Sequence, residues 1–416
     1  MRARTSVARA AVMAVAVSLL VACGNASASS PGSSSSPPST PGSGQGQPSS
    51  TPTGASTPPA VPVQLTSNVK DGAGSVKVDT VVAVKATSGQ VTKVTLSYRT
   101  VDRQGRTVKG KVAGALSANG VSWTAADRLE PAASYKLTMV GQNAARQTAT
   151  ATSAFKTQRL TLAQQTFAEL YPLKGSRVGV GMPAILRFDV PVHNKKEFQK
   201  NLHVTSSPKQ VGTWAWYSDR EVHFRPKTYW KPGTKVSVNA HLNGVNAGHG
   251  IYGQNSTTTS FTVGRSLVTK INLARHVAKV YRSGKLVRTI AISGGKPGWQ
   301  TRSGTKLVVD KLYTTRMTNQ MIGAKEQYDL KVYYAMRITN SGEFMHAAPW
   351  NAGNFGRFNA SHGCVGMSTG NAAWLFGQVL IGDPVVTTGS SRGLERGNGY
   401  TDWNISYAQY AKGSAL

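Results

Sequence analysis

The segment Ser361-His362-Gly363-Cys364 contains one of only two cysteines in this 416-residue chain. The other, Cys23, ends an apolar N-terminal run. A thiol with no disulfide partner is a hazard in an oxidising compartment unless the thiol itself does chemistry. His362 stands two residues before Cys364, and His346 stands eighteen before it. Because an imidazole can take the proton of a thiol, the segment predicts cysteine–histidine nucleophilic catalysis.

His346 is the preferred general base, because it arrives from a separate segment and can approach the thiol from the opposite side. The two side chains are expected to rest as a thiolate–imidazolium pair. No Asp or Glu occurs from Phe344 through Gly382. The acceptor that orients the imidazole is therefore expected to be a main-chain carbonyl, or a carboxylate from elsewhere. Gly363 leaves main-chain N–H groups accessible to an oxyanion.

Metal chemistry has weaker support than thiol chemistry. The chain has no HExxH motif, and His241 and His249 are eight residues apart without an acid or thiol nearby. A zinc site built from Cys364, His346 and His362 is conceivable but ranks below thiol catalysis. We therefore predict neither a metal nor a cofactor.

The N-terminus predicts export. Arg2, Arg4 and Arg9 precede the thirteen-residue run Ala10–Ala22, which is apolar or small apart from Ser18. That run is shorter than the roughly 20 residues of a membrane span and is typical of a secretory signal. Leu20-Val21-Ala22-Cys23 resembles a bacterial lipobox, in which cleavage precedes a cysteine that receives a lipid. The alternative is an ordinary signal peptide that is cut slightly later.

Residues 24–62 consist almost entirely of small residues, Pro and Gln, with no charge and no aromatic side chain. Such a segment cannot bury enough apolar area to fold. It is predicted to be a disordered linker with a root-mean-square span of roughly 35 Å, or about 130 Å fully extended. We expect the mature protein to be lipid-anchored at the outer face of the cytoplasmic membrane and to extend into the cell wall.

Lys and Arg outnumber Asp and Glu by 48 to 17, a formal charge of +31. Removing the three leader arginines leaves 45 − 17 = +28, because residues 1–62 contain no acid. In an intracellular protein this excess would suggest nucleic acid. For an exported chain we predict anionic wall polymers or lipid headgroups, and no nucleic acid. The basic residues are spread along the chain, so a generally basic surface without a specific site remains an alternative.

The remaining chain is predicted to be mainly β. Short alternating runs such as 92–98 and 134–139, separated by Gly and Asn turns, are typical of immunoglobulin-like sandwiches. Trp214 and Trp216 share one face of a strand, and we interpret them as core rather than as a sugar platform. The predicted modules are sandwiches at 63–160 and 161–265, a mixed-sheet domain at 266–390 and a C-terminal extension at 391–416.

The third module has recognisable local elements. A β-hairpin is predicted over 277–290, and a single main helix begins at the N-cap Ser368 and ends before Gly382-Asp383-Pro384. A strand follows at 384–388. The segment Gly294-Gly295-Lys296-Pro297-Gly298 lacks the spacing of a phosphate-binding loop and is interpreted as a plain turn.

Two stretches resemble the signature of L,D-transpeptidases: Phe344-Met345-His346-Ala347-Ala348-Pro349-Trp350-Asn351 and Ser361-His362-Gly363-Cys364-Val365-Gly366. The resemblance extends over about 170–412 and includes Asp402-Trp403-Asn404-Ile405, similar to a C-terminal extension that packs on the catalytic domain. It implies that a cysteine attacks a stem tetrapeptide of peptidoglycan and releases D-Ala. The amine of a neighbouring diamino acid then resolves the thioester into a 3→3 crosslink.

The resemblance also implies roles for individual residues. Cys364 is the nucleophile and His346 the general base and acid. Gly363 and Cys364 lie at the oxyanion hole, while the loop is shaped by Ser361 and His362. The flap and the substrate-lining positions are Tyr328, Ser341, Gly342 and Gly366. Carbapenem β-lactams are the implied inhibitors.

Two positions depart from the family pattern. Ala347 stands where many relatives have Ser, and Gly366 where many have Asn or Arg, so only a main-chain contact to substrate is predicted there. Two other functions stay open: an L,D-carboxypeptidase, in which water resolves the thioester, and a non-catalytic wall-binding lipoprotein.

Overall fold

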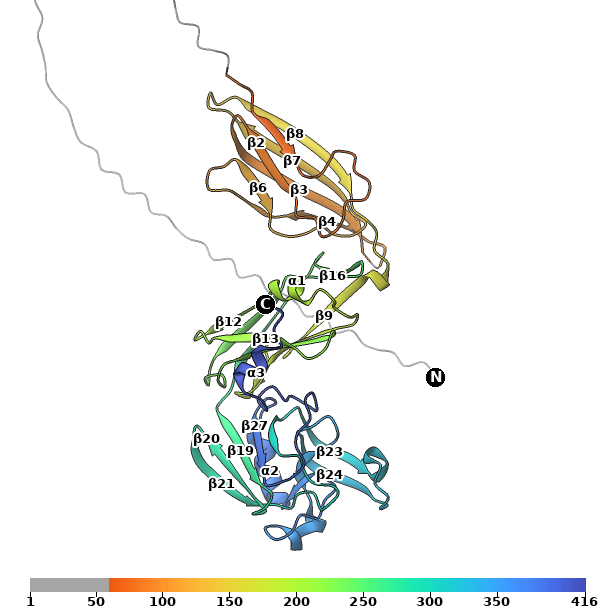
Figure 1. Ribbon diagram of the computed structural model, residues 1–416, viewed down its shortest axis with the longest axis vertical. Coiled ribbons are helices and arrows are strands. Elements are labelled where there is room, and N and C mark those ends of the chain that lie inside the picture. Colours follow the sequence, from red (N-terminus) through yellow and green to blue (C-terminus); the bar gives the residue numbers. More distant parts are fainter. Residues whose placement is uncertain (1–59, 103) are drawn as a thin grey trace, which may run out of the picture. The chain divides into compact units, whose positions relative to one another are not determined.

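The computed structural model describes residues 60–102 and 104–416 (Figure 1). The predicted leader, Cys23 and the predicted linker up to residue 59 lie outside the described residues. Strands dominate the described chain and helices are few, so the mainly β fold class is confirmed. Within the described ranges, no helix is both long and apolar enough to cross a membrane.

The first sandwich consists of two four-stranded sheets, β1-β2-β6-β5 and β4-β3-β7-β8 (Figure 1). Its strands are β1 (Gln64–Ser67), β2 (Ala83–Thr87), β3 (Gln90–Val101), β4 (Thr107–Val112), β5 (Gly114–Leu116), β6 (Ser122–Ala125), β7 (Ser134–Gln142) and β8 (Thr148–Lys156). Leu96, Trp123, Leu137 and Phe155 pack between the sheets. Because side chains alternate along a strand, their neighbours face solvent.

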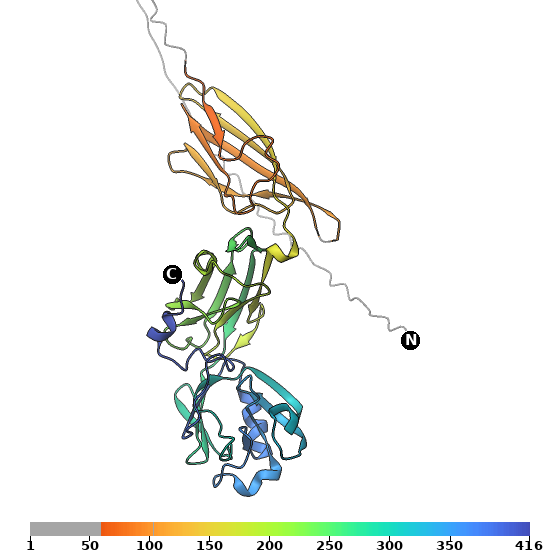
Figure 2. The same ribbon diagram turned by 45° about the vertical axis from the view of Figure 1, so that its right-hand side comes forward.

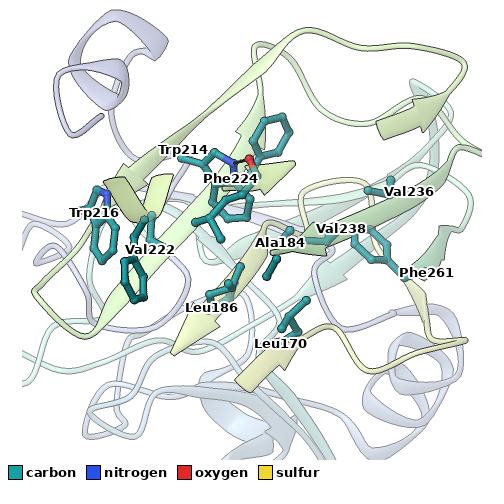
Figure 3. Packing of buried hydrophobic residues seen from close by; sticks show 14 of the residues in the cluster. Leu170, Ala184, Leu186, Trp214, Trp216, Val222, Phe224, Val236, Val238 and Phe261 are labelled. Carbon is teal, nitrogen blue, oxygen red and sulfur yellow. Dashed lines mark hydrogen bonds between the residues drawn. The ribbon is translucent and has the colours of Figure 1, made fainter. Parts of the chain in front are cut away.

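The second sandwich pairs a four-stranded sheet, β10-β18-β15-β12, with a six-stranded sheet, β13-β14-β11-β9-β17-β16. Its elements are β9 (Gln165–Tyr171), β10 (Arg177–Val178), β11 (Ala184–Phe188), α1 (Lys195–Lys200), β12 (Leu202–Ser207), β13 (Gly212–Trp216), β14 (Glu221–Pro226), β15 (Lys235–Ala240), β16 (Asn246–Gly248), β17 (Ile251–Gln254) and β18 (Thr257–Val263). Trp214 and Trp216 are buried in its core (Figure 3). Their indole nitrogens donate to Leu202 O and Gln199 Oε1, both at 3.1 Å. The interpretation of this pair as core is confirmed.

The third module holds the sheets β21-β20-β19-β27-β22 and β23-β24-β25-β26. Its elements are β19 (Leu267–Asn272), β20 (Val277–Arg282), β21 (Lys285–Ala291), β22 (Gly304–Leu307), β23 (Asp310–Thr318), β24 (Asp329–Arg337), β25 (Phe344–Ala347), β26 (Val365–Met367), α2 (Thr369–Gln378) and β27 (Pro384–Thr388). The β20–β21 hairpin, α2 and β27 are where the sequence predicts them. Ser368 Oγ caps α2 by accepting from Asn371 N, and Ala372 and Leu375 anchor the helix in the core.

The C-terminal extension contacts both preceding modules. Asn404 Oδ1 accepts from Thr305 N at 2.9 Å, so the predicted packing on the third module is present. The extension also returns to the second sandwich, where α3 (Tyr407–Ala411) lies beside β13 (Figure 2). There the Trp403 ring lies 4.4 Å from the Arg225 guanidinium, and Trp403 Nε1 donates to Gly181 O. The sequence does not predict this second contact.

An ionic cluster joins the extension to β14. His223 is 1% exposed; its Nδ1 lies 2.8 Å from Asp402 Oδ1 and its Nε2 lies 2.7 Å from Glu221 Oε1. Although burial opposes ionisation, the two carboxylates prevail and raise the pKa of His223 to about 9. This histidine is therefore charged at neutral pH and stabilises the attachment of the extension.

Candidate active site

Two neighbouring strands bring the cysteine and histidine segments together. β25 and β26 pair in parallel, with Met345 opposite Val365 and His346 opposite Gly366. Cys364 immediately precedes β26, so the thiol and the imidazole enter one cavity of about 840 Å³. The seventeen residues between them, 347–363, include a 3₁₀ segment, Pro349–Asn354. The structure thus juxtaposes the two predicted catalytic side chains.

His346 is oriented by a main-chain carbonyl. Its Nδ1 lies 2.8 Å from Ala347 O, and the residue is 5% exposed. Because a carbonyl only accepts, Nδ1 carries the proton and Nε2 is left as the basic nitrogen. The predicted main-chain acceptor is therefore present, and the side chain at position 347 plays no part in it. Burial lowers the pKa of His346, so the imidazole is neutral.

Cys364 is a protonated thiol in this geometry. The side chain is half-buried and faces the cavity. Burial raises its pKa to about 12; a main-chain contact with Phe344 lowers it and the charge of Glu343 raises it further. Among the described residues the hydrogen-bond partner of the thiol is Gly342 O, at 3.6 Å, and not His346. The prediction of a resting thiolate–imidazolium pair is wrong: both members rest neutral.

Ser361 fixes the loop that carries the thiol. Its hydroxyl accepts from Gly363 N at 3.1 Å and donates to Cys364 O at 2.6 Å. Thr301 Oγ1 donates to Gly363 O at 2.8 Å. Gly363 has a φ of +121°, which L side chains rarely adopt, so glycine is required. The predicted oxyanion role of Gly363 needs correction, because its N–H is already bonded to Ser361.

Gly366 does not offer the predicted main-chain contact to substrate. Its N–H donates to Ser293 O at 2.9 Å, and its carbonyl accepts from Ser293 N at 3.0 Å. An added Cβ would lie 2.9 Å from the Cβ of Ala348, so the close approach of the two segments requires a glycine. Gly366 lines the cavity, but both of its backbone polar groups are used within the protein.

The segment 294–298, which follows β21, contains the predicted turn and also contacts the loop that carries Cys364. Residues 297–298 do form a turn. Just before it, however, Gly295 forms a parallel bridge with Ser361. A Cβ on Gly295 would lie 1.9 Å from Trp299 O. Glycine at position 295 therefore allows this segment to support the loop that carries Cys364.

His362 lies at the rim of the cavity, between two aromatic rings. Its ring stacks on Tyr328 at 5.3 Å and meets Trp299 edge-on, also at 5.3 Å. Its Nε2 contacts the carboxylate of Glu326. Lys296 Nζ lies 2.5 Å and 2.7 Å from the two oxygens of that carboxylate. Lys296 and then His362 lower the pKa of Glu326, so His362 is held by a charged partner.

Ser341 and Gly342 also line the cavity, and the C-terminal extension positions them. Ser341 N donates to Asn398 Oδ1, and Asn398 Nδ2 donates back to Ser341 Oγ, both at 2.9 Å. The carbonyl of the next residue, Gly342, accepts a hydrogen bond from the Cys364 thiol. The side-chain amide of Asn398, which lies outside the third module, thus fixes the position of the chain segment that faces Cys364.

A buried ionic group beneath the loop escapes the sequence analysis. Glu343 is 2% exposed, and its carboxylate lies 2.8 Å from Lys306 Nζ and 3.0 Å from Arg302 Nη1. Burial lowers the pKa of Lys306, opposed by Glu343. Glu343 stands one residue outside the acid-free stretch 344–382, and its lysine and arginine partners are about forty residues upstream. Only the fold reveals this contact.

Metal binding finds no geometric basis in the described ranges, where no three His, Cys, Asp or Glu side chains are close enough to hold an ion.

Comparison with known proteins identifies the family. Residues 73–246 match the model of a bacterial Ig domain, and residues 267–387 match the L,D-transpeptidase catalytic domain. The chain is 33% identical to L,D-transpeptidase 2 of Mycobacterium tuberculosis (strain CDC 1551 / Oshkosh) over 359 residues, which is 85% of each chain. The chain belongs to the L,D-transpeptidase family. Cys364, His346 and the cavity lie inside the matched catalytic domain of this L,D-transpeptidase.

Other relatives match over shorter ranges. L,D-transpeptidase 5 of Mycobacterium tuberculosis (strain ATCC 25618 / H37Rv) is 34% identical over 250 residues, 58% of this chain and 55% of the relative. The solved structure of the LD transpeptidase LdtMt1 in complex with imipenem is 32% identical, with a TM-score of 0.47. It covers 53% of this transpeptidase and 98% of that chain.

Proposed function

We propose that this L,D-transpeptidase forms 3→3 peptidoglycan crosslinks with Cys364 as the nucleophile and His346 as the general base and acid. The observation that carries the proposal is the convergence of the only thiol among the described residues and a neutral imidazole on adjacent strands at one cavity. Ala347 O fixes the imidazole so that Nε2 is the basic nitrogen. A neutral base next to a protonated thiol is suited to transferring the proton during the attack.

The first half-reaction transfers the acyl group to the enzyme. Nε2 of His346 takes the proton as the sulfur of Cys364 attacks the carbonyl between the diamino acid and the terminal D-Ala of a stem tetrapeptide. The carbon–nitrogen bond breaks, and the imidazolium returns the proton to the amine of the departing D-Ala. A thioester on Cys364 remains.

The second half-reaction transfers the acyl group to another stem. The side-chain amine of a diamino acid in a neighbouring stem attacks the thioester and loses a proton to His346. The carbon–sulfur bond breaks, and the proton returns to the sulfur of Cys364. Since Gly363 N is engaged by Ser361, we assign the oxyanion of both steps to the main-chain N–H of Cys364.

The neighbouring residues bind the peptide. Tyr328, Ser341 and Gly342 line the same cavity as the thiol, and their fixed positions favour a single orientation of the stem. His362 and Ser361 shape the loop and do not exchange protons with substrate. Their support is the ring stack with Tyr328 and the two hydrogen bonds of the Ser361 hydroxyl.

The experiment is incubation of the purified protein with a stem tetrapeptide, followed by mass spectrometry. Crosslinked dimer with loss of D-Ala is expected; free tripeptide alone would establish the L,D-carboxypeptidase instead. Carbapenem treatment should add an acyl adduct that Cys364→Ala lacks. A folded protein that forms neither product nor adduct would leave only the wall-binding role.

Export and lipid attachment complete the proposal. The leader and Cys23 are expected to place the enzyme, by its N-terminal lipid, at the outer face of the cytoplasmic membrane. In a bacterial host, Cys23→Ala should yield a protein that lacks the lipid mass and leaves the membrane fraction. Retention of the variant in the membrane would argue against this anchor.

A further inference from the structure

The first sandwich has a strongly basic outer face that the catalytic chemistry does not use. It lies on the sheet β4-β3-β7-β8 (Figure 1). The inner face of this sheet packs Tyr135 and Phe155 into the core. We call five of the exposed cations on the outer side of these strands the basic face: Arg99, Lys109, Lys111, Lys136 and Lys156.

Strand register gathers these cations into two adjacent rows. In the first row Arg99 is flanked by Lys109 on β4 and Ser134 on β7, and Ser134 is followed by Lys156 on β8. In the second row Ser97 separates Lys111 from Lys136. Neighbouring positions are about 5 Å apart across the strands, and the rows are about 7 Å apart along them. The charges, which look scattered in sequence, therefore meet on one surface.

Within the part of the chain that the structure describes, the cations of the basic face have no acidic partners. None of the five takes part in an ion pair with any residue in 60–102 or 104–416. The acid in the adjoining β3–β4 turn, Asp102, is bound by Arg106 at 2.7 Å. Like charges on facing positions of a sheet repel and destabilise the fold. An unpaired cluster of this kind indicates a surface whose counter-charge comes from outside the chain.

The groups between the cations narrow the chemistry of the partner. A hollow of about 530 Å³ is lined by four cations of the basic face (Arg99, Lys109, Lys111 and Lys136), by Ser97 and Ser134, and by Gly110, Tyr98 and Tyr135, whose rings pack toward the core. Phosphate oxygens in complexes are contacted by Lys and Arg together with Ser and Thr hydroxyls. Thr95, Thr138 and Thr152 form the next row of the same face. Cations interspersed with hydroxyls therefore fit a phosphodiester.

Two other classes of polyanion fit less well. Surfaces that bind membranes bury Trp, Phe or Leu among the headgroups, whereas the aromatic residues of these strands, Tyr98, Tyr135 and Phe155, pack toward the core. Proteins that bind single-stranded nucleic acid present aromatic rings on which bases stack, and the rows of the basic face contain none. The geometry therefore favours a flexible anionic polymer that carries neither nucleobases nor acyl chains.

We propose that the basic face of the first sandwich binds a linear phosphodiester-linked polyol polymer. Binding by the outer sandwich would hold the enzyme among anionic chains while the catalytic cavity, on a different module, remains free for stem peptides. The proposal does not depend on the catalytic roles given above, because none of its residues lines the cavity.

The test measures binding of a synthetic poly(glycerol phosphate), fluorescently labelled, to the whole chain at several salt concentrations. If all five cations make contact, the slope of log K against log salt is expected to be about −3.5, at about −0.7 per contact for a flexible chain. The test variant replaces Arg99, Lys109, Lys111 and Lys136 by Gln. It should weaken binding roughly tenfold or more and bring the slope near −1.

The matched control replaces four exposed lysines of the second sandwich by Gln: Lys174, Lys209, Lys227 and Lys231. It removes the same net charge, and its affinity should stay within about twofold of the parent chain. Thermal unfolding and carbapenem acylation should be unchanged in both variants. Equal weakening in the two variants would overturn the proposal in favour of a diffuse basic surface.

Two further probes test the choice of partner. Both probes are negatively charged. Poly-L-glutamate presents its charge as carboxylates, and vesicles of phosphatidylglycerol with phosphatidylcholine present it as lipid headgroups. The basic face should bind both more weakly than poly(glycerol phosphate) at equal charge concentration. Tighter binding of either probe, abolished by the four substitutions in the first sandwich, would replace the phosphodiester by that partner and refute the proposal.

Discussion

His223 and His346 are both almost fully buried, yet the protein holds them in opposite charge states. His223 lies between the carboxylates of Glu221 and Asp402, and its pKa is raised to about 9. Among the described residues the hydrogen-bond partner of His346 is the carbonyl of Ala347, and burial lowers its pKa. A full negative charge can offset the desolvation of an imidazolium, whereas a carbonyl dipole cannot. One histidine is consequently a charged attachment point and the other a neutral base.

The difference teaches how to assign a buried histidine a role. Burial is common to the two residues, so it does not discriminate. The partner does: paired carboxylates make the imidazolium permanent and chemically inert, while a lone carbonyl selects a tautomer and leaves the other nitrogen basic. The predictions that follow change one side of this comparison at a time.

The largest effect is expected from removing the neutral histidine. His346→Ala should slow acylation by a carbapenem roughly 10³-fold, because the proposed general base is lost. Stopped-flow or mass-spectrometric acylation rates measure this loss. His203→Ala, a change at an exposed histidine of the second sandwich, serves as the control and should acylate like the parent. A His346→Ala protein that retains its rate would remove this residue from the chemistry.

Removing the charged histidine should destabilise the protein and leave the chemistry intact. His223→Gln leaves the buried Asp402 without its cationic partner, which is expected to lower the free energy of unfolding by roughly 3 kcal/mol. Urea denaturation followed by tryptophan fluorescence measures it. Acylation by the folded fraction should be unchanged. Unaltered stability would show that the cluster does not hold the extension.

The charged histidine also predicts a pH dependence of stability. Since its pKa in the folded protein is about 9, above the ordinary value of about 6.5, its stabilisation is complete below about pH 6.5 and is lost as the pH rises through 9. The expected loss is roughly 3 kcal/mol across that window. Urea unfolding at several pH values should show it in the parent chain but not in His223→Gln. Parallel profiles in the two proteins would contradict this origin.

The neutral state of the proposed catalytic pair, Cys364 and His346, predicts how the thiol reacts with iodoacetamide. Because burial raises the pKa of Cys364 to about 12, the alkylation rate should keep rising with pH, without a plateau near neutrality. His346→Ala should change this profile by less than about threefold, since the imidazole does not hold a thiolate. A plateau of the alkylation rate near pH 7 that disappears in His346→Ala would show that Cys364 and His346 do rest as a thiolate–imidazolium pair.

The smallest effect is expected at the carbonyl partner itself. Ala347→Ser keeps the main chain that accepts from His346 Nδ1, so the acylation rate should stay within about twofold of the parent. Rates of carbapenem acylation across pH 6 to 8 provide the comparison. An increase well above that range would mean that a hydroxyl at this position contributes, as the family pattern suggests.

The sequence predicts those features that depend on local pattern. Alternation and turn residues locate the β20–β21 hairpin, Ser368 locates α2, and the shared strand face of Trp214 and Trp216 places both in a core. The family signature places His346 and Cys364 in one site. The absence of acids between 344 and 382 leaves two acceptors for the imidazole, a main-chain carbonyl or a distant carboxylate, and the structure shows the carbonyl of Ala347.

Features that depend on how the chain closes on itself could not be predicted. The amides of Gly363 and Gly366 are occupied because Ser361 and Ser293 happen to lie beside them, and no local pattern records that. The ionic partners of His362 and Glu343 come from segments dozens of residues away. The neutral thiol is a consequence of burial, which only the packed domain determines.

The Asn398–Ser341 contact has a practical consequence for fragments of this enzyme. A catalytic fragment that ends before residue 391 would contain every residue that lines the cavity, yet it would lack the amide that fixes Ser341 and the neighbouring Gly342. Inhibitors screened against such a fragment would meet a differently shaped acceptor beside the thiol. Rankings of compounds that extend toward Ser341 should therefore be obtained with the C-terminal extension in place.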